Sequence, residues 1–163
     1  LGVCVISILI EDFYFYWIHR FLHWGFMYKA IHKMHHKYQA PFGIAAEYAH
    51  PVETIILGFG TSIGPMLFAD HVFSMYFYLA VRLFQTIECH TGYDFPWSLN
   101  NLYPLWGGAD FHDHHHKAFV SSHYENLGSL QNGNYASSII FWDAVFGTDG
   151  AYRSAREAKQ KTE

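Results

Sequence analysis

Histidine is the residue type with the most evident chemistry, since the chain holds 13 histidines against 10 lysines and arginines together. Histidine is the commonest metal ligand in proteins, through the lone pair of its neutral imidazole. Many of the histidines lie in three short clusters: HRFLH at 19–23, HKMHH at 32–36 and HDHHH at 112–116. On a helix, positions i, i+3 and i+4 share one face, so each cluster can direct several imidazoles toward one point. His114 falls off that face.

The number of clustered histidines predicts two metal ions rather than one. A zinc site closes with about four ligands, fewer than the clusters offer together with His90, which follows the second apolar segment. The HExxH motif of zinc peptidases is absent from the sequence. The soluble di-iron bundles use two Glu-x-x-His motifs, whereas this sequence has the spacing once, at Glu47 and His50. Imidazole suits zinc, copper, iron and nickel, so ligand type alone leaves the metal open. The predicted metal ligands are His19, His23, His32, His35, His36, His90, His112, His115 and His116.

Other polar residues near the clusters have two interpretations. His50 is a candidate metal ligand or substrate-side residue, but its place before Pro51 also suits the start of a helix. Carboxylates can orient metal-bound imidazoles through hydrogen bonds, or can end helices and face solvent. The candidate carboxylates are Asp113, Asp94 and Glu47, together with Asp12, Glu53 and Glu88.

The composition favours a membrane protein. Hydrophobic residues make up 51% of the chain and charged residues only 15%, against about 25% in an ordinary soluble domain. Residues 52–69 and 72–87 are almost entirely apolar, which predicts a transmembrane helical hairpin over about 52–88. A buried hairpin of a soluble helical protein is the alternative.

Gly60 and Gly64 are interpreted as small residues for close helix packing. The net charge of −4 and the lack of a basic run exclude a nucleic-acid partner.

Basic residues predict the orientation of this hairpin. They occur at 20–37 before it and at 117–161 after it, whereas the connection at 70–71 has none. The positive-inside rule then places both flanks in the cytoplasm. The histidines before and after the hairpin can therefore meet. We predict an all-α integral-membrane protein with a transmembrane hairpin and a cytoplasmic-facing, histidine-rich di-metal domain. Residues 1–163 are expected to form a single domain, with 150–163 as a charged tail.

The motifs also resemble a known family. Besides the ordered histidine clusters, the sequence has QAPFG at 39–43, AEYAHP at 46–51, HTGYD at 90–94, GNYAS at 133–137 and WDAVFGT at 142–148. In these residues the chain resembles the fatty acid hydroxylase/sterol desaturase superfamily, and within it the C4-methyl sterol oxidases (methylsterol monooxygenases). The resemblance covers nearly the whole chain. Residues 121–132, which include His123, depart from the family pattern as an unusual insertion, and His123 is not assigned as a ligand.

The resemblance implies a function. Family members of this kind use two irons per chain to activate O2 and oxidise the C4-methyl group of a sterol in sterol biosynthesis. Electrons come from NAD(P)H through a reductase and cytochrome b5. A family member has further apolar N-terminal helices, so this chain, which begins at Leu1 in an apolar run, is expected to be truncated. Lys159 and Lys161 resemble a dilysine retrieval signal, which implies a multi-pass protein of the endoplasmic reticulum membrane.

The sequence leaves other functions open. A related sterol desaturase, or a fatty-acid or alkane hydroxylase, can use the same scaffold, and only the segment around Glu47 and His50 favours C4-methyl sterols. A non-catalytic membrane metal-binding protein would be expected to have ligands inside the membrane helices, yet the clusters lie outside 52–87. A membrane haem protein would need paired histidines across those helices.

Overall fold

The computed structural model describes residues 2–103, 105–121 and 133–161. Within these ranges the regular secondary structure is helical, and the β-structure is limited to an isolated antiparallel bridge between Trp106 and Ile139. Most of the predicted insertion, residues 122–132 with His123, lies outside the described residues. The helices, of which η1 and η2 are 3₁₀ helices, are α1 (Gly2–Leu22), α2 (Gly25–Ala30), η1 (His32–Lys37), η2 (Gly43–Glu47), α3 (Pro51–Phe68), α4 (Val72–Cys89), α5 (Leu99–Leu102), α6 (Ala109–Ser121), α7 (Phe141–Phe146) and α8 (Gly150–Gln160).

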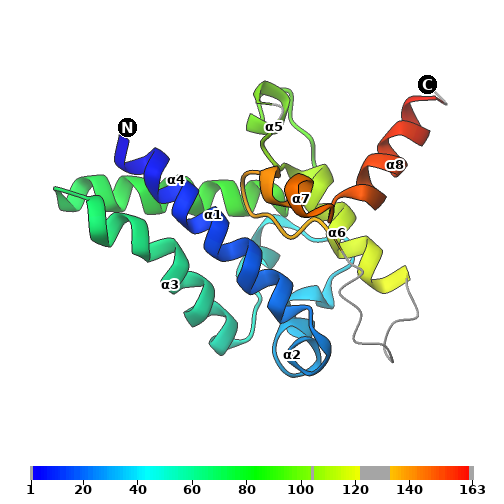
Figure 1. The fold of residues 1–163 in the computed structure, drawn as a ribbon, viewed down its shortest axis with the longest axis horizontal. Coiled ribbons are helices and arrows are strands. Elements are labelled where there is room, and N and C mark those ends of the chain that lie inside the picture. Colours follow the sequence, from blue (N-terminus) through cyan, green and yellow to red (C-terminus); the bar gives the residue numbers. More distant parts are fainter. Residues whose placement is uncertain (1, 104, 122–132, 162–163) are drawn as a thin grey trace.

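Three long helices form one half of the molecule. Helices α3 and α4 meet at a tip, and α1 runs alongside α3 (Figure 1). Each arm of this hairpin begins with a histidine as its N-cap: His50 Nδ1 accepts from the Val52 amide at 3.2 Å, and His71 Nδ1 accepts from the Phe73 amide at 3.0 Å. An N-cap side chain of this kind satisfies an amide that the first turn of a helix leaves open.

Small residues allow α1 and α3 to pack closely. A Cβ at Gly60 would lie 2.2 Å from Cδ1 of Tyr14, and one at Gly64 would lie 2.5 Å from Cα of Ser7. Only glycine therefore fits at these two positions. The prediction of glycines for close helix packing is confirmed.

Two of the long helices can cross a membrane by length and composition: α1 and α3. Only 28% of the α1 span and 22% of the α3 span are buried inside the protein, whereas a core helix of a soluble protein is mostly buried. The sequence predicts a membrane-spanning helix in each arm of the hairpin. Among the described residues, however, α4 is not apolar enough to be a candidate span. Its inner face holds buried polar residues, namely Arg82, Gln85 and Glu88.

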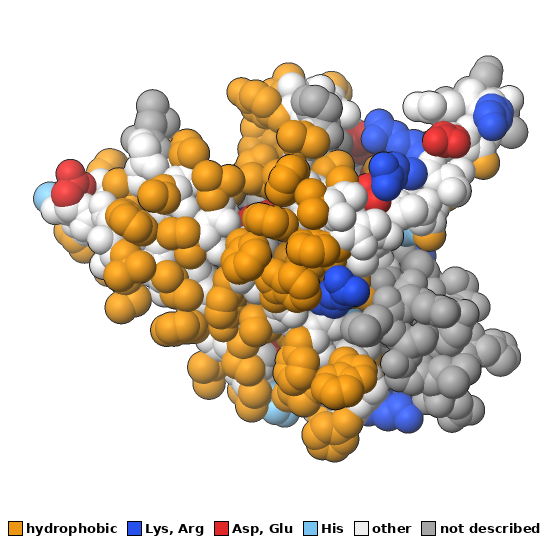
Figure 2. Space-filling model, viewed as in Figure 1, with side chains coloured by type: hydrophobic (Ala, Val, Ile, Leu, Met, Phe, Trp, Pro, Cys, Tyr) orange, Lys and Arg blue, Asp and Glu red, His pale blue; other side chains and the backbone are white. Residues whose placement is uncertain are grey.

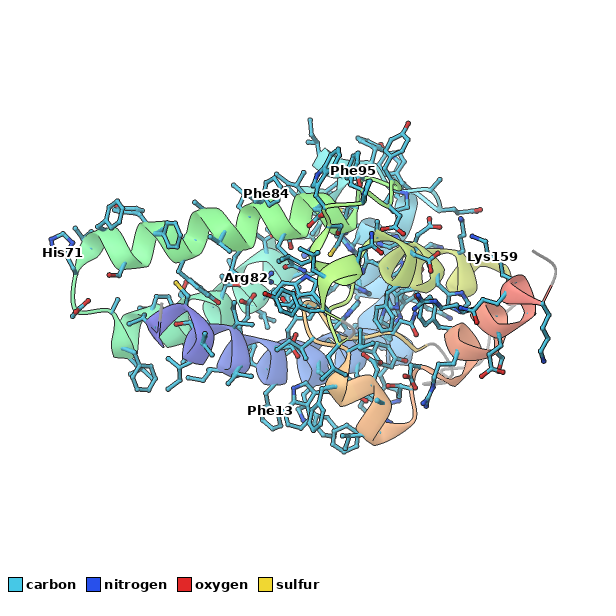
Figure 3. All side chains as sticks on the ribbon, turned by 90° about the horizontal axis from the view of Figure 1, so that it is seen from above. Phe13, His71, Arg82, Phe84, Phe95 and Lys159 are labelled. Atoms are coloured by element: carbon cyan, nitrogen blue, oxygen red, sulfur yellow. The ribbon has the colours of Figure 1, made fainter. Side chains whose placement is uncertain are left out.

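The outer surface of the long helices is apolar. Ile55, Phe59 and Phe73 are 71%, 60% and 70% exposed, and hydrophobic side chains cover this half of the visible face, while Lys and Arg gather on the other half (Figure 2). Figure 3 shows Phe13 and Phe84 pointing outward from α1 and α4, whereas Arg82 points between the helices. An outward apolar surface around an inward polar one indicates membrane association.

A buried ion pair joins the long helices. The Arg82 side chain donates to both carboxylate oxygens of Glu11, which also accept from Thr61 Oγ1 at 2.9 Å and Tyr78 Oη at 2.5 Å. Glu11 and Arg82 are 2% and 5% exposed. A buried charge is costly unless it is paired and hydrogen-bonded, and here one network from α1, α3 and α4 meets both conditions.

The histidine clusters lie at the opposite end from the hairpin tip, where α2, η1, α6 and the end of α1 come together (Figure 1). The charged tail forms α8, whose residues are mostly exposed and which projects away from the rest of the molecule. Both the helical fold class and the buried histidine clusters predicted from the sequence are confirmed.

Candidate metal centre

Four segments of the chain bring the predicted ligands together. His19 lies in the last turn of α1, and His23 follows that helix directly. The 3₁₀ helix η1 contributes three histidines, and His90 is the C-cap residue of α4. Because the hairpin returns the chain to the end from which it started, the histidines of α6 can reach those of α1 and η1.

The structure divides the nine predicted ligands into two buried groups. Within each group the nearest ligand atoms all lie within 4.8 Å of one another. Both η1 and α6 contribute to both groups, so the two candidate sites are adjacent. The five-histidine cluster consists of His19, His23, His32, His36 and His115, and the four-histidine cluster of His35, His90, His112 and His116.

The Nε2 atoms within each cluster have the spacing of ligands around one ion. Two nitrogens that each bind a metal at about 2.1 Å, at an angle of about 90–110°, lie about 3.0–3.4 Å apart. In the five-histidine cluster the Nε2–Nε2 distances are 3.1 Å for His19–His32, 3.0 Å for His32–His36 and 3.2 Å for His36–His115. In the four-histidine cluster they are 3.4 Å for His35–His90, 2.9 Å for His90–His112 and 3.1 Å for His112–His116.

The other ring nitrogen, Nδ1, decides the tautomer of several of these imidazoles. A backbone carbonyl can only accept, so the Nδ1 that faces it must carry the proton. Four imidazoles donate to carbonyls in this way: His19 to Tyr135 (2.8 Å), His115 to Gly133 (2.7 Å), His90 to Thr86 (2.8 Å) and His116 to Tyr38 (3.2 Å). A neutral imidazole has one N–H only, so Nε2 of these four rings presents a lone pair to the cluster.

Burial keeps the imidazoles neutral. Desolvation lowers the pKa of His32 and of His116 to about 3 and that of His90 to about 4, because a buried site disfavours the charged form. The same cause lowers the pKa of His35, His36, His112 and His115 well below the usual value.

Neutral rings of fixed tautomer leave lone pairs facing one another. His19 and His115 direct such lone pairs into the five-histidine cluster, and His90 and His116 direct theirs into the four-histidine cluster. A cation at the centre of each cluster removes this repulsion and turns each lone pair into a ligand bond. The two buried histidine clusters are therefore suited to a di-metal site.

One carboxylate orients a cluster imidazole directly. Nδ1 of His32 lies 2.7 Å from Oε1 of Glu53, at the start of α3, and both side chains are buried. A carboxylate hydrogen-bonded to the outer nitrogen of a metal-binding histidine holds the ring in place and raises its basicity.

The other candidates from the sequence lie elsewhere. His50 caps α3 outside both clusters. Asp113 pairs with Lys117 on the surface of α6, and Asp94 accepts from Asn101 Nδ2 at 2.8 Å. The exposed Glu47 lines a cavity next to the clusters. The backbone carbonyls that orient the rings were not predicted, because no side-chain pattern reports a carbonyl, although two of them lie in the GNYAS motif at 133–137.

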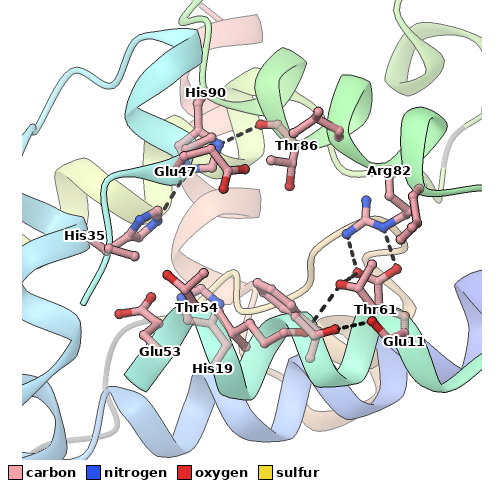
Figure 4. Close-up of a pocket in the computed structure, with 18 of the residues that line it drawn as sticks. Glu11, His19, His35, Glu47, Glu53, Thr54, Thr61, Arg82, Thr86 and His90 are labelled. Atoms are coloured by element: carbon pink, nitrogen blue, oxygen red, sulfur yellow. Dashed lines mark hydrogen bonds and ion pairs between the residues drawn. The ribbon is translucent and has the colours of Figure 1, made fainter. Parts of the chain in front are cut away.

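The cavity beside the clusters has a volume of about 430 Å³, within the range of about 300–1,000 Å³ typical of small-molecule sites. Histidines of both clusters line one part of it, and α1, α3 and α4 supply apolar side chains including Phe15, Leu57 and Leu83. Figure 4 shows His35, His90, Glu47 and Glu53 at one end of the cavity and Arg82, Thr61 and Glu11 at the other. The cavity thus connects the metal-binding end with the apolar half of the molecule.

Comparison with known proteins identifies the class. The sequence profile of the fatty acid hydroxylase family matches residues 4–148, and the chain belongs to this family. It is 58% identical over 156 residues to a Dictyostelium discoideum protein provisionally named a methylsterol monooxygenase, a match that covers 95% of this chain and 54% of that protein. No solved structure matches the chain.

Two plant proteins show the range of names among its relatives. Methylsterol monooxygenase 2-2 of Arabidopsis thaliana is 45% identical over 152 residues, covering 93% of this chain and 54% of the relative. The very-long-chain aldehyde decarbonylase GL1-11 of Oryza sativa is 45% identical over 153 residues, with 94% and 54% covered. The chain therefore spans about half the length of the curated relatives it matches.

Proposed function

We propose that the protein containing this chain is a membrane-bound methylsterol monooxygenase with two irons, which oxidises the C4-methyl group of a sterol. The observation that carries the proposal is the pair of adjacent, buried clusters of neutral imidazoles, with lone pairs directed inward, at the end of a largely apolar cavity. Relatives named as methylsterol monooxygenases support the substrate class. We further propose that residues 1–163 act as a single domain.

When bound, the two irons supply O2 activation and transfer of one oxygen atom to a methyl C–H bond; the other oxygen leaves as water after uptake of two electrons and two protons. The chain's own residues hold and orient this centre. The nine histidines are the proposed ligands, and Glu53 fixes the ring of His32. The apolar walls of the cavity exclude water and accept a hydrophobic substrate.

The electrons are proposed to come from NAD(P)H through a reductase and cytochrome b5, because oxygen-atom transfer needs an external electron donor and the resemblance to the C4-methyl sterol oxidases implies these donors. The location is proposed to be the endoplasmic reticulum membrane, with the metal centre facing the cytoplasm. The basic residues near the clusters, Arg20, Lys29, Lys33 and Lys37, support this orientation under the positive-inside rule. Lys159 and Lys161, which resemble a dilysine retrieval signal, support the compartment.

The test compares neighbouring histidines of α6 in the full-length protein, purified in detergent without chelators. We expect about two irons per chain in the unaltered protein and conversion of a 4-methyl sterol when the electron donors are supplied. His115→Ala is expected to lower the iron content and abolish turnover, because its Nε2 faces the five-histidine cluster. His114→Ala is the matched control, since His114 instead packs against Tyr152.

Less than one metal ion per chain in the unaltered protein would contradict the proposal. The rice relatives favour a second candidate, aldehyde decarbonylation at the same metal centre. Two bound irons with conversion of a long-chain aldehyde, and without conversion of any 4-methyl sterol, would replace the first candidate by the second.

A further inference from the structure

The segment of residues 133–139 forms part of the metal centre through its backbone. It provides the carbonyl of Gly133 to Nδ1 of His115 and the carbonyl of Tyr135 to Nδ1 of His19. Both of these imidazoles belong to the five-histidine cluster. The segment is not helical, so regular secondary structure does not hold these two carbonyls in place.

Two buried aspartates bind the amides of this segment instead. Asp143 accepts from the amide of Tyr135 at 2.9 Å and from that of Ala136 at 2.7 Å. Asp12, on α1, accepts from the amides of Ser138 and Ile139, both at 2.9 Å. The segment is therefore bound by a carboxylate on each side of Ser137.

Asp143 is the more closely coupled of the two aspartates to the imidazoles. Its side chain is 0% exposed, and Thr148 Oγ1 also donates to it, at 2.6 Å. Burial raises the pKa of the Asp143 carboxyl, and a buried carboxylate is costly unless its oxygens accept hydrogen bonds. Asp143 accepts from the amides of Tyr135 and Ala136. The Ala136 amide belongs to the same peptide group as the Tyr135 carbonyl, which accepts from Nδ1 of His19.

Two further contacts fix the start of the segment. Asn134 has a positive φ of 62° and donates from Nδ2 to the carbonyl of Phe111 at 2.9 Å. A Cβ at Gly133 would lie 1.6 Å from the carbonyl oxygen of Thr148, so only glycine fits there. The carbonyl of Gly133 is thus placed against α6, which contains His115.

The four-histidine cluster is oriented by different parts of the chain. His90 donates to the carbonyl of Thr86 within α4, and His116 donates to that of Tyr38. Neither carbonyl belongs to residues 133–139. A change that displaces this segment therefore acts first on the five-histidine cluster.

We propose that Asp143 is a positioning residue for the metal of the five-histidine cluster, acting through the backbone carbonyl of Tyr135, which orients His19. This inference rests on the proposed binding of two metal ions by the nine histidines. The imidazoles of the two clusters are oriented by different backbone carbonyls. One metal ion can therefore be released without the other. Loss of an outer hydrogen-bond partner weakens metal binding by about 10–100-fold in comparable sites.

The experiment uses Asp143→Asn in the full-length protein, loaded with ferrous iron in detergent. The asparagine keeps the shape but turns an N–H donor toward one of the two backbone amides, so a hydrogen bond is replaced by repulsion. We expect one ion to be bound about 10–100-fold more weakly, seen as a fast phase of iron release to a chelator, while the second ion is released at the unaltered rate.

Double variants identify which site is affected. When Asp143→Asn is combined with His112→Ala, the five-histidine cluster loses its positioning residue and the four-histidine cluster loses a ligand. The iron content is then expected to fall to nearly none. Combined with His36→Ala, which affects the five-histidine cluster again, it is expected to leave about one ion per chain. Thr148→Val removes one hydrogen bond to Asp143 and is expected to accelerate iron release from the five-histidine cluster by a smaller factor. This variant replaces Asp143→Asn in the experiment if Asp143→Asn does not fold.

Asp70→Asn is the matched control, since it makes the same carboxylate-to-amide change at the hairpin tip, where Asp70 accepts from Ser74 Oγ at 3.4 Å. It is expected to leave the release of both ions unchanged. Unchanged release from Asp143→Asn, or equal acceleration of both ions, would overturn the inference while leaving the proposed function standing. Fewer than two ions in the unaltered protein would overturn the proposed function itself.

Discussion

At the level of single residues, the two nitrogens of each imidazole have different tasks. Nε2 faces the cluster, while Nδ1 of His19, His90, His115 and His116 donates to a backbone carbonyl. Fixing the tautomer in advance means that ion binding needs no rearrangement of ring protons. Neutral ligands leave the positive charge of the ions uncompensated, and a nearby buried carboxylate such as Glu53 offsets part of it.

Burial of the imidazoles predicts how stability depends on pH. The pKa of His32 is about 3 in the folded protein, against about 6.5 when exposed. Between these values the unfolded chain binds a proton that the folded chain does not, so stability is lost as pH falls below about 6.5. We expect the thermal midpoint of the metal-free protein to decrease steadily from pH 7 to pH 4. His32→Phe should reduce the number of protons taken up on unfolding in this range by about one, so the midpoint should depend less on pH. A midpoint independent of pH in the unaltered protein would contradict the burial of the imidazoles.

At the level of the helices, the contact between α1 and α3 depends on the absence of side chains. Gly64 faces the backbone of Ser7, so a methyl group there requires one helix to move. Gly58, on the same helix, has no atom within 4 Å of the position of a new Cβ. The two glycines therefore provide a matched pair.

We expect Gly64→Ala to destabilise the protein by about 1–3 kcal/mol, the usual cost of overpacking. Gly58→Ala should leave stability unchanged or raise it by up to about 1 kcal/mol, because alanine favours the helix over glycine. Unfolding in detergent by increasing denaturant measures both. Equal effects of the two substitutions would show that α1 and α3 do not pack closely at Gly64.

The ion pair of Glu11 and Arg82 explains why α4 remains beside α1 although it is less apolar. Its charges lie between the helices, where Tyr78 and Thr61 complete the hydrogen bonding of Glu11. Arg82 also donates to Ser137 Oγ at 2.8 Å. The same network therefore connects the long helices with the segment that supports the five-histidine cluster.

At the level of the whole molecule, the chain has an apolar half and a metal-binding half. The proposed ligands come from α1 with the residue following it, from η1, from the end of α4 and from α6. Bound ions would therefore join segments that are far apart in the sequence. A ligand that binds only the folded state stabilises it by about 4 kcal/mol at a thousand times its dissociation constant.

Metal removal is expected to lower the thermal midpoint and to loosen one end of the molecule selectively. After chelation, amide hydrogen exchange should increase in η1 and α6, while the closely packed part of α3 around Gly60 should remain protected. Differential scanning fluorimetry and exchange mass spectrometry in detergent measure these effects. An unchanged midpoint, with equal exchange before and after chelation, would contradict metal binding by these segments.

The sequence by itself determined the helical class, the close-packing glycines and the histidines that form the two clusters. These features follow from local composition and helical periodicity: apolar segments of 15–18 residues are visible directly, as are imidazoles spaced for one helix face. The sequence did not show which histidines share a site, because His32 and His36 belong to one cluster and His35 to the other.

Only the tertiary structure decided how the nine histidines divide into two clusters, and which groups orient their rings. The carbonyls of Tyr135 and Gly133 orient rings on α1 and α6, and a carbonyl is present at every residue, so no residue type marks its role. The structure likewise selected Glu53 among several candidate carboxylates, and it placed Asp113 and Asp94 against Lys117 and Asn101. Contacts of this kind depend on how distant segments pack, which residue spacing along the chain does not record.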